Sequence, residues 1–194
     1  MSNLNTRTPS GADVTQRTDL KPAFSQTLFE QTFRLENLQK TWKQVRANKG
    51  APGVDGMTIE GFPTWARDGN WNCIDSDLET GHYQPSPVRR VEIDKPDGGK
   101  RQLGIPTVID RVIQQAIAQV LTPIFDPALS NHSFGFRQGR NGQQAVKQVQ
   151  HIIKSGRRFA VDVDLSKFFD RVNHDLLMTS SSKNLAKVCH REGL

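Results

Sequence analysis

The most informative part of the sequence is RFAVDVDLSKFFDRVNHDLLM, residues 158–178. Within it, apolar side chains alternate with Ala160, Asp162 and Asp164 over residues 159–165, and this period of two predicts a strand with one buried face. Asp is a poor strand former, so two carboxylates on the opposite face are unusual. Carboxylates at the end of a strand can hold a hard cation such as Mg²⁺, which prefers one or two carboxylates plus substrate phosphates. The alternative is that both lie on a solvated strand face and have no chemical role.

A turn and a short helix follow the predicted strand. Asn173 is placed to cap this helix, which would carry Leu176 and Leu177 inward. The turn itself has the spacing Asp-Leu-Ser-Lys-Phe-Phe-Asp from Asp164 to Asp170. This spacing resembles the first catalytic motif of the reverse transcriptase palm, in the form used by group II intron-encoded proteins.

The resemblance implies roles for three residues of this motif. Asp164 would be the catalytic carboxylate that binds the metal ions, Mg²⁺ in the complete enzyme, and the backbone carbonyl of Leu165 would also reach them. Phe169 would lie under the sugar of the incoming nucleotide. Asp162 matches a position that is not a ligand in the family, and Asp170 lies past the turn, so neither replaces a second metal ligand.

The N-terminal part extends the same resemblance. Residues 1–25 are rich in Ser, Thr, Asn and Asp without apolar periodicity, so we expect a disordered leader. Residues 28–45 carry apolar residues at helical spacing, and Gly50 provides a stop. The turn APGVDG, residues 51–56, leads to Thr58, which is placed to cap a second helix. The run APGVDGMTIE resembles the N-terminal extension of these reverse transcriptases, in which the loop lies against the template strand.

The clearest hairpin signal lies at residues 88–105, and a short helix is expected before it, near residues 73–80. Two alternating runs flank the turn Pro-Asp-Gly-Gly. The run VRRVEIDKPDGGKRQLGIPTVIDRVIQQAI resembles the fingers hairpin of the family, whose basic residues close over the incoming triphosphate. Lys95 and Arg101 match that nucleotide-binding role, and Gln102 replaces a proline that is usual in the family. Taken alone, a basic hairpin tip could equally serve solubility.

Two helices and a loop complete the chain between the hairpin and the opening stretch. Asp110 is placed to cap a helix whose apolar stripe ends at Pro123. Residues 131–140, NHSFGFRQGR, resemble the family's FGFRPGR segment, with Gln138 in place of proline. Such a mixture of aromatic and guanidinium groups can stack bases and hold phosphates. Asn141 is placed to cap the last helix. Its inward-facing residues are expected to be Ala145, Val146, Val149, Ile152 and Ile153.

Positive charge is concentrated in one segment. The chain has 26 Lys and Arg against 20 Asp and Glu, a net charge of +6, which favours an anionic partner. Residues 127–161 alone contain six Lys or Arg and no acidic residue. Beside a metal-binding strand, charge of one sign is more typical of a nucleic-acid track than of a solvated face. The predicted RNA-binding residues are Arg137, Arg140, Arg157 and Arg158.

The matching blocks follow one another in order over about residues 28–178. We therefore expect an α+β fold, the fingers and partial palm of a right-hand polymerase, with helices around a β-hairpin and a first palm strand. The expected organisation is a disordered leader (1–25), a helical N-terminal extension (26–80), the fingers (81–158), the start of the palm (159–178) and a non-matching tail that reads like a truncated or frame-shifted ending (179–194).

The resemblance implies an RNA-directed DNA polymerase that binds an RNA template, a DNA primer and dNTP, and that in its complete form takes part in intron splicing and mobility. In the family the remaining metal ligands come from a Tyr-Ala-Asp-Asp hairpin. This sequence has no adjacent Asp pair, and its only tyrosine is Tyr83. We therefore expect the chain to be inactive in polymerisation alone. Whether another polypeptide completes the palm is left open.

Two other functions compete with this one. The first is a non-catalytic, maturase-like RNA-binding module. The second is a metal-dependent nuclease using Asp162 and Asp164, which is disfavoured because no His or Glu general base accompanies them. The sequence has no apolar run as long as a membrane span and no signal-peptide core, and Cys73 and Cys189 are isolated from each other. We therefore expect a cytoplasmic protein without a membrane partner.

Overall fold

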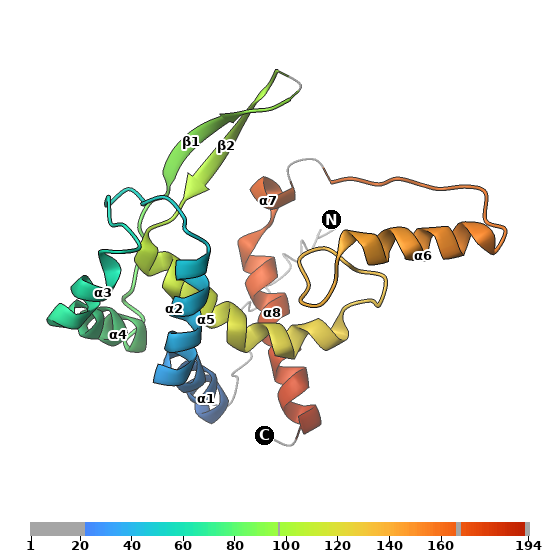
Figure 1. Cartoon of the computed structure of the whole chain (residues 1–194). Coiled ribbons are helices and arrows are strands. Elements are labelled where there is room, and N and C mark those ends of the chain that lie inside the picture. The colour runs from blue at the N-terminus through green and yellow to red at the C-terminus, as the bar shows by residue number, and fades with distance from the viewer. Residues whose placement is uncertain (1–21, 97, 166–167, 193–194) are drawn as a thin grey trace, which may run out of the picture. The chain divides into compact units, whose positions relative to one another are not determined.

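The computed structural model describes residues 22–96, 98–165 and 168–192. One compact unit is Gln26–Val163 and a second includes Asp164–Leu194; each is described by itself. The mixture of helices with one small antiparallel sheet confirms the expected combination of α and β structure (Figure 1). The helices are α1 (Pro22–Phe33), α2 (Leu35–Ala47), α3 (Phe62–Trp65), α4 (Trp71–Glu79), α5 (Val108–Phe125), α6 (Gly142–Lys154), α7 (Phe168–Arg171) and α8 (His174–Glu192), with a π-helical turn at Ala66–Asn70 and a 3-10 turn at Asp126–Ala128. The strands are β1 (Arg89–Asp94) and β2 (Lys100–Ile105).

The first helical segment is interrupted. The sequence predicts one helix over residues 28–45, whereas α1 ends and α2 begins on either side of Arg34, which is extended with φ −60° and ψ 139°. Leu35, one of the apolar residues predicted to face inward on this helix, is 69% exposed. Of the leader expected at residues 1–25, residues 1–21 lie outside the described residues, and the remainder belongs to α1.

A small apolar core joins α2, α3 and α5. The Phe62 ring stacks on Trp42, with 4.9 Å between the ring centroids. Burying one Val or Phe side chain contributes roughly 1.5–3 kcal/mol, so this cluster outweighs helix propensity in fixing α2 against α5. Its buried members are Val45, Ile59, Phe62, Val108 and Val112.

The APGVDG turn, residues 51–56, packs against the start of α5. A Cβ added to Gly53 would lie 2.7 Å from the Cα of Thr107, so only glycine allows this approach of the two backbones. At the other end of the turn, Thr58 Oγ1 accepts a hydrogen bond from the amide of Gly61 at 3.1 Å, just before α3. Thr58 thus stabilises the turn before α3, but the N-cap of α3 is Gly61, without a side-chain cap hydrogen bond, so the expected helix cap at Thr58 is wrong.

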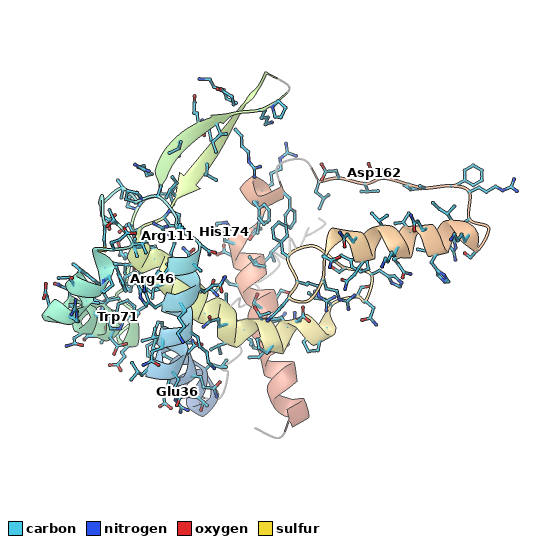
Figure 2. The ribbon with its side chains drawn as sticks, in the orientation of Figure 1. Glu36, Arg46, Trp71, Arg111, Asp162 and His174 are labelled. Atoms are coloured by element: carbon cyan, nitrogen blue, oxygen red, sulfur yellow. The ribbon has the colours of Figure 1, made fainter. Side chains whose placement is uncertain are left out.

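Arg111, labelled in Figure 2, fastens this turn to α5. Its Nη2 donates to the carbonyl of Ala51 at 2.7 Å, and its guanidinium fills the space beside Gly50. Gly50 therefore makes room for the side chain of Arg111, which a larger residue would displace. The residue with positive φ after α2 is Lys49, at +45°.

The predicted hairpin is confirmed. β1 and β2 pair in antiparallel register, with Arg89 opposite Ile105 at the base and Asp94 opposite Lys100 near the tip. The turn is closed by a hydrogen bond of 2.7 Å, which the Lys95 amide donates to the carbonyl of Gly99.

The ends of α5 differ from the prediction. Thr107, and not Asp110, is the N-cap, because its extended backbone lets Oγ1 accept from the Asp110 amide at 3.1 Å. Pro123 does not end the helix, which runs on to Phe125. The predicted stripe is buried only in its first part. Val112, Ile113 and Ala116 are buried, whereas Ile117 is 39% exposed.

α6 begins as predicted but does not bury its apolar face. Asn141 Oδ1 accepts from the Gln144 amide at 2.9 Å, and Gln144 Oε1 accepts from the Asn141 amide at 3.0 Å, forming a capping box. Inward packing is wrong, since Val146, Val149 and Ile153 are 57%, 55% and 60% exposed. An amphipathic pattern shows which face a helix can bury, but it does not supply the partner.

The strand predicted over residues 159–165 is also wrong for the described structure. This segment has no strand pairing, and the sheet contains only β1 and β2. Phe159 and Val161, on its apolar face, are 98% and 89% exposed. Alternation sets the two faces of a strand, but ladder hydrogen bonds from a neighbour complete it. No described segment provides them.

The helix after the motif is longer than expected. Asn173 Oδ1 accepts from the Leu176 amide at 3.0 Å, which confirms the predicted cap. The helix, α8, has 19 residues, and Leu176 and Leu177 are 68% and 53% exposed, so their inward packing is wrong. None of the described helices is both long and apolar enough to cross a membrane.

Candidate nucleic-acid interface

Some of the cationic side chains of the hairpin form an ion pair within the hairpin, and others do not. Lys100 Nζ forms an ion pair with Glu92 Oε2 at 2.8 Å. Arg101 lies opposite Ile93 on the other face of the hairpin. Lys95 and Arg101, the predicted triphosphate ligands, are exposed, and neither forms an ion pair within the described residues. The two are therefore accessible to an anionic ligand.

A buried polar cluster anchors the base of the hairpin. Asp110 is 2% exposed. It accepts hydrogen bonds from the Tyr83 hydroxyl at 2.8 Å, the Thr107 hydroxyl at 2.6 Å and the Ser86 amide at 3.2 Å. Burial raises the pKa of Tyr83, and the hydrogen bond from its hydroxyl to Asp110 and the charge of Asp110 raise this pKa further. The cluster ties the segment before β1 to the first turn of α5, into which β2 leads, and so holds both strands at their base.

The loop after α5 is organised by Arg137. Its guanidinium donates to both carboxylate oxygens of Asp126, at 2.8 and 3.0 Å, and to the carbonyls of Ser130 and Ser133, at 2.8 and 3.2 Å. The Arg137 side chain is only 8% exposed. The hydrogen bond from Arg137 holds the pKa of Asp126 below its usual range. Arg137 is therefore occupied inside the loop, where a phosphate would have to displace existing partners.

Arg140 is engaged in the same loop. It donates from Nη1 to the carbonyl of Asn131 at 2.6 Å, and its guanidinium carbon lies 5.5 Å from the centroid of the Phe134 ring. The neighbouring aromatic, Phe136, has φ +55° and is fully exposed. The two arginines thus fix the loop while one aromatic projects from it.

The remaining predicted cations, Arg157 and Arg158, are exposed in the segment that follows α6. They belong to the first unit, as does Asp162, which is labelled in Figure 2. No ion pair joins either arginine to another described residue. Of the four predicted RNA-binding residues, these two are available to phosphate without rearrangement.

The predicted metal ligands lie in the second unit. Asp164 is exposed, and Leu165 is 64% exposed. Phe169 lies on α7, is 85% exposed and contacts Phe168, with ring centroids 5.3 Å apart. Asp162 is exposed in the first unit.

A carboxylate and a backbone carbonyl are donors that Mg²⁺ accepts, so the chemistry of Asp164 and Leu165 fits part of a magnesium site. Within the described parts of the chain, no group of three or more His, Cys, Asp or Glu side chains could hold a metal ion. The ligands present therefore amount to a partial set.

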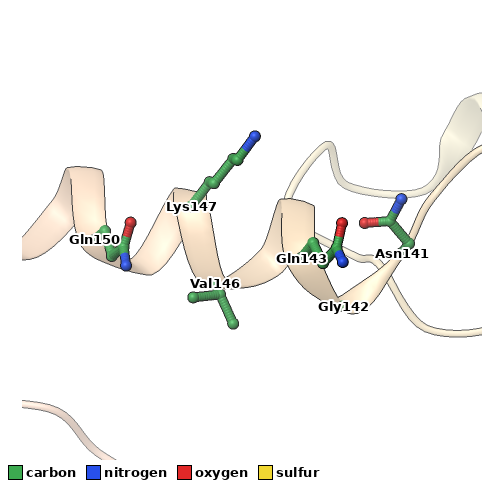
Figure 3. A pocket seen from close by; sticks show the side chains of 6 residues that line it. All are labelled: Asn141, Gly142, Gln143, Val146, Lys147 and Gln150. Carbon is green, nitrogen blue, oxygen red and sulfur yellow. The ribbon is translucent and has the colours of Figure 1, made fainter.

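A shallow hollow lies on α6 alone. Figure 3 shows Lys147 and Val146 leaving the helix in opposite directions, with Gln143 and Gln150 along it. The residues that line this hollow come from a single helix and its cap, Asn141. Its lining residues include no carboxylate, hydroxyl or thiol beside Lys147, and we assign it no chemistry.

Sequence patterns missed two features of the interface. Tyr83 stands in Gly-His-Tyr-Gln-Pro, between a helix and a strand, where no periodicity predicts a buried contact. The pairing of Asp126 with Arg137 spans a loop, and charge counting interprets Arg137 as free. The signal that could have suggested this pair is that Asp126 is the last acidic residue before the basic segment.

Residues 93–186 match the family described as reverse transcriptase (RNA-dependent DNA polymerase). The match runs from β1 into α8, and thus continues past Met178, where the resemblance was expected to stop.

Curated relatives match about three quarters of the chain. The group II intron-encoded protein LtrA of Lactococcus lactis is 32% identical over 154 residues, which is 78% of this chain and 25% of the relative. Protein YkfC of Escherichia coli is 36% identical over 146 residues, 72% of this chain and 38% of the relative. The putative COX1/OXI3 intron 1 protein of Saccharomyces cerevisiae is 31% identical over 146 residues, 74% of this chain and 17% of the relative. The chain thus spans well under half the length of each.

Proposed function

We propose, from the premise that the chain belongs to the group II intron-encoded reverse transcriptase and maturase family, that it provides the fingers and the start of the palm of an RNA-directed DNA polymerase. In the complete enzyme these parts bind the RNA template and the incoming dNTP beside a DNA primer, in the service of intron splicing and mobility. The proposed partners of the chain are therefore RNA and a nucleoside triphosphate.

One observation carries this proposal. The matched range, residues 93–186, includes both the exposed cations of the hairpin and the Asp164 motif. Phosphoryl transfer depends on positioning and on positive charge at the phosphate oxygens. Lys95 and Arg101 would supply such charge, and their freedom from ion pairs within the described residues supports this role.

In the palm, Asp164 and the backbone carbonyl of Leu165 would hold Mg²⁺, whose charge stabilises the oxygens of the reacting phosphate when it is bound. The chain's own contribution is an exposed carboxylate at Asp164 and the backbone carbonyl of the next residue. Phe169, exposed on α7, would contact the sugar of the nucleotide and restrict what fits at its 2′ position.

RNA binding divides between two kinds of arginine. Arg157 and Arg158 are exposed and would contact phosphates directly. Arg137 and Arg140 make their hydrogen bonds within the 126–140 loop, so they would act by holding it in shape. This division refines the expectation that all four arginines form one phosphate-binding track.

The second candidate function is a non-catalytic RNA-binding module. The partial set of metal ligands favours it, because the described residues offer no cluster of three or more such side chains. Both candidates predict RNA binding. They differ in whether primer extension, once the chain is joined to the rest of a palm, depends on Asp164.

RNA binding by the chain can be tested through its salt dependence. Each phosphate contact to a single strand contributes about 0.7 to the slope of log K against log salt. Replacing both Arg157 and Arg158 by Ala should therefore reduce the slope by about 1.4 in filter-binding titrations with single-stranded RNA. The matched control replaces Arg67 and Lys183, two exposed cations outside the basic segment.

The control variant should keep the wild-type slope, whereas Arg137→Ala should perturb the loop and unfold it more readily. If the wild-type chain binds no RNA, or if the Arg157 and Arg158 variant keeps the full slope, the segment is a solvated face and this part of the proposal fails.

A further inference from the structure

A groove runs along α5, between α2 and the 126–140 loop. Its larger part, about 740 Å³, is lined by the amide side chains of Gln44, Gln115, Gln119 and Gln138 and by Phe136, among others. A smaller part of about 280 Å³, with Arg111 at its edge, shares Gln115 and Ala118 with the larger one. The two hollows therefore form one continuous surface. Its lining contains five glutamines, one guanidinium and one exposed aromatic ring.

A buried relay orients the amides on α5. Gln119 Nε2 donates to Asn37 Oδ1 at 2.8 Å and to Thr41 Oγ1 at 2.9 Å, and Thr41 is fully buried. The Oε1 of Gln119 in turn accepts from Gln115 Nε2 at 3.5 Å. The relay thus fixes Gln119 in the α2–α5 interface, and the Oε1 of Gln115 accepts no hydrogen bond from another described residue.

Two further amides line the groove without internal partners. The side chains of Gln44 and Gln138 make no hydrogen bond to any other described residue. Each offers one carbonyl oxygen and one amino group. Together with Gln115, they give the groove donors and acceptors that are not used by the fold.

Phe136 supplies an aromatic face at the edge of the groove. Its φ of +55° is uncommon for a bulky residue, and its ring is fully exposed. The hydrogen bonds of Arg137 to Asp126 and of Arg140 to Asn131 hold the loop that presents it. A large ring kept in solvent on a strained but well-anchored backbone has no packing role to explain it.

The charge of the groove suits a neutral ligand attached to an anionic chain. Asp126 is the one carboxylate in the lining, and the guanidinium of Arg137 pairs with it at 2.8 Å. Side-chain amides form paired hydrogen bonds with base edges, and aromatic rings stack on unpaired bases, which contributes about 1–3 kcal/mol per base.

We propose that this groove binds unpaired nucleobases of single-stranded RNA, with one base stacked on Phe136 and its edge hydrogen-bonded by Gln115 and Gln138. The inference rests on the proposed RNA-binding function and adds a contact to bases, distinct from the phosphate contacts of Arg157 and Arg158. It also assigns Arg137 and Arg140 the task of positioning Phe136.

The test uses the whole 194-residue chain and two RNA strands of equal length and charge. One contains 2-aminopurine among ordinary bases, and the other contains abasic sites. We expect the base-bearing strand to bind about 5- to 150-fold more tightly, since stacking is lost in the abasic strand. The fluorescence of 2-aminopurine should be quenched on binding. Phe136→Leu should abolish the quenching and bring the two affinities together, while Phe136→Tyr should preserve both effects.

The matched control is Phe159→Leu, which alters another almost fully exposed phenylalanine that does not line the groove. It should leave the ratio of the two affinities unchanged. If the wild-type chain binds both strands equally, or if Phe136→Leu keeps the preference for bases, the inference is overturned while the phosphate contacts stand. If neither strand binds, the proposed function fails and the inference fails with it.

Discussion

Tyr83 and Asp110 show how one residue pair can position a functional element. The hydroxyl of Tyr83 donates to Asp110 at 2.8 Å, and Asp110 is almost completely buried. The pair joins the segment before the hairpin to the helix after it. A change at Tyr83 should therefore act on stability and on the placement of the hairpin, although Tyr83 is far along the chain from the predicted catalytic carboxylate.

Tyr83→Phe removes this one hydrogen bond and little else. We expect the free energy of unfolding to fall by about 1 kcal/mol at neutral pH, the typical net contribution of a hydrogen bond. Denaturant titration followed by circular dichroism would measure this difference. An unchanged midpoint would mean that the bond does not hold the base of the hairpin.

The same variant should change the pH dependence of stability. The folded-state pKa of Tyr83 is raised by burial, then by the hydrogen bond and charge of Asp110. The stabilising contribution is therefore fully present below the unfolded pKa of about 10 and is lost as pH rises towards the folded value. Above about pH 10 the wild-type chain should lose stability more steeply than Tyr83→Phe, so that the gap between them narrows.

At the residue scale, the sequence indicates the type of each charged group but not the partner that the group binds in the folded chain. It predicts Arg137 as a phosphate ligand, whereas that side chain is 8% exposed and bound to Asp126. It predicts Asp110 as a helix cap, whereas Thr107 has that role. The prediction for Asp110 is wrong, whereas the RNA-binding role of Arg137 stays a prediction. Neither contact could be read from the sequence, because a pairing across a loop or between elements depends on the folded geometry. The face of Arg101 follows from the strand register, which the local alternation already indicates, whereas Lys95 lies in the turn after β1.

At the scale of elements, the hairpin and the α6 cap are predictable because their determinants are local. Pro-Asp-Gly-Gly between alternating runs specifies the turn, and Asn141 with Gln144 specifies the capping box. The 159–165 strand and the burial of α6 depend on partners distant in sequence. Those residues keep their alternation and amphipathic pattern but remain exposed in the described structure.

The hairpin offers a matched pair for testing the triphosphate role. Arg101→Ala and Lys100→Ala each remove one positive charge from β2, but Lys100 already pairs with Glu92 at 2.8 Å. In the chain fused to the remaining palm and thumb of an intron-encoded relative, Arg101→Ala should raise the apparent KM for dNTP by about tenfold, since a lost charge-assisted hydrogen bond costs about 1.5 kcal/mol or more. Lys95→Ala should act in the same direction.

Lys100→Ala is the control for net charge and should change the apparent KM much less. Steady-state primer extension at varied dNTP would measure all three variants. Equal effects of Arg101→Ala and Lys100→Ala would show that only the total charge of the hairpin matters, and would remove Arg101 from the nucleotide site.

At the scale of the whole molecule, the number of metal ligands would limit the proposed polymerisation. An in-line displacement assisted by two metal ions about 3.5–4 Å apart needs several charged ligands. Asp164 and the carbonyl of Leu165 form part of such a set, and the 194 residues contain no adjacent Asp pair. The isolated chain should therefore show no primer extension on an RNA template, with Mg²⁺ or Mn²⁺, above a control without enzyme.

Fusion to the remaining palm and thumb of an intron-encoded relative should make the role of each motif residue measurable. Asp164→Ala should abolish extension, because the metal ions would lose a charged ligand and the reacting oxygens their stabilisation. Asp162→Asn should be tolerated much better, since Asp162 is not a proposed ligand and asparagine keeps its shape. Phe169→Ala should allow ribonucleotides to be incorporated, because the aromatic contact under the sugar would be absent. Extension by the unfused chain that disappears in Asp164→Ala would contradict the ligand argument and require further metal ligands within these 194 residues.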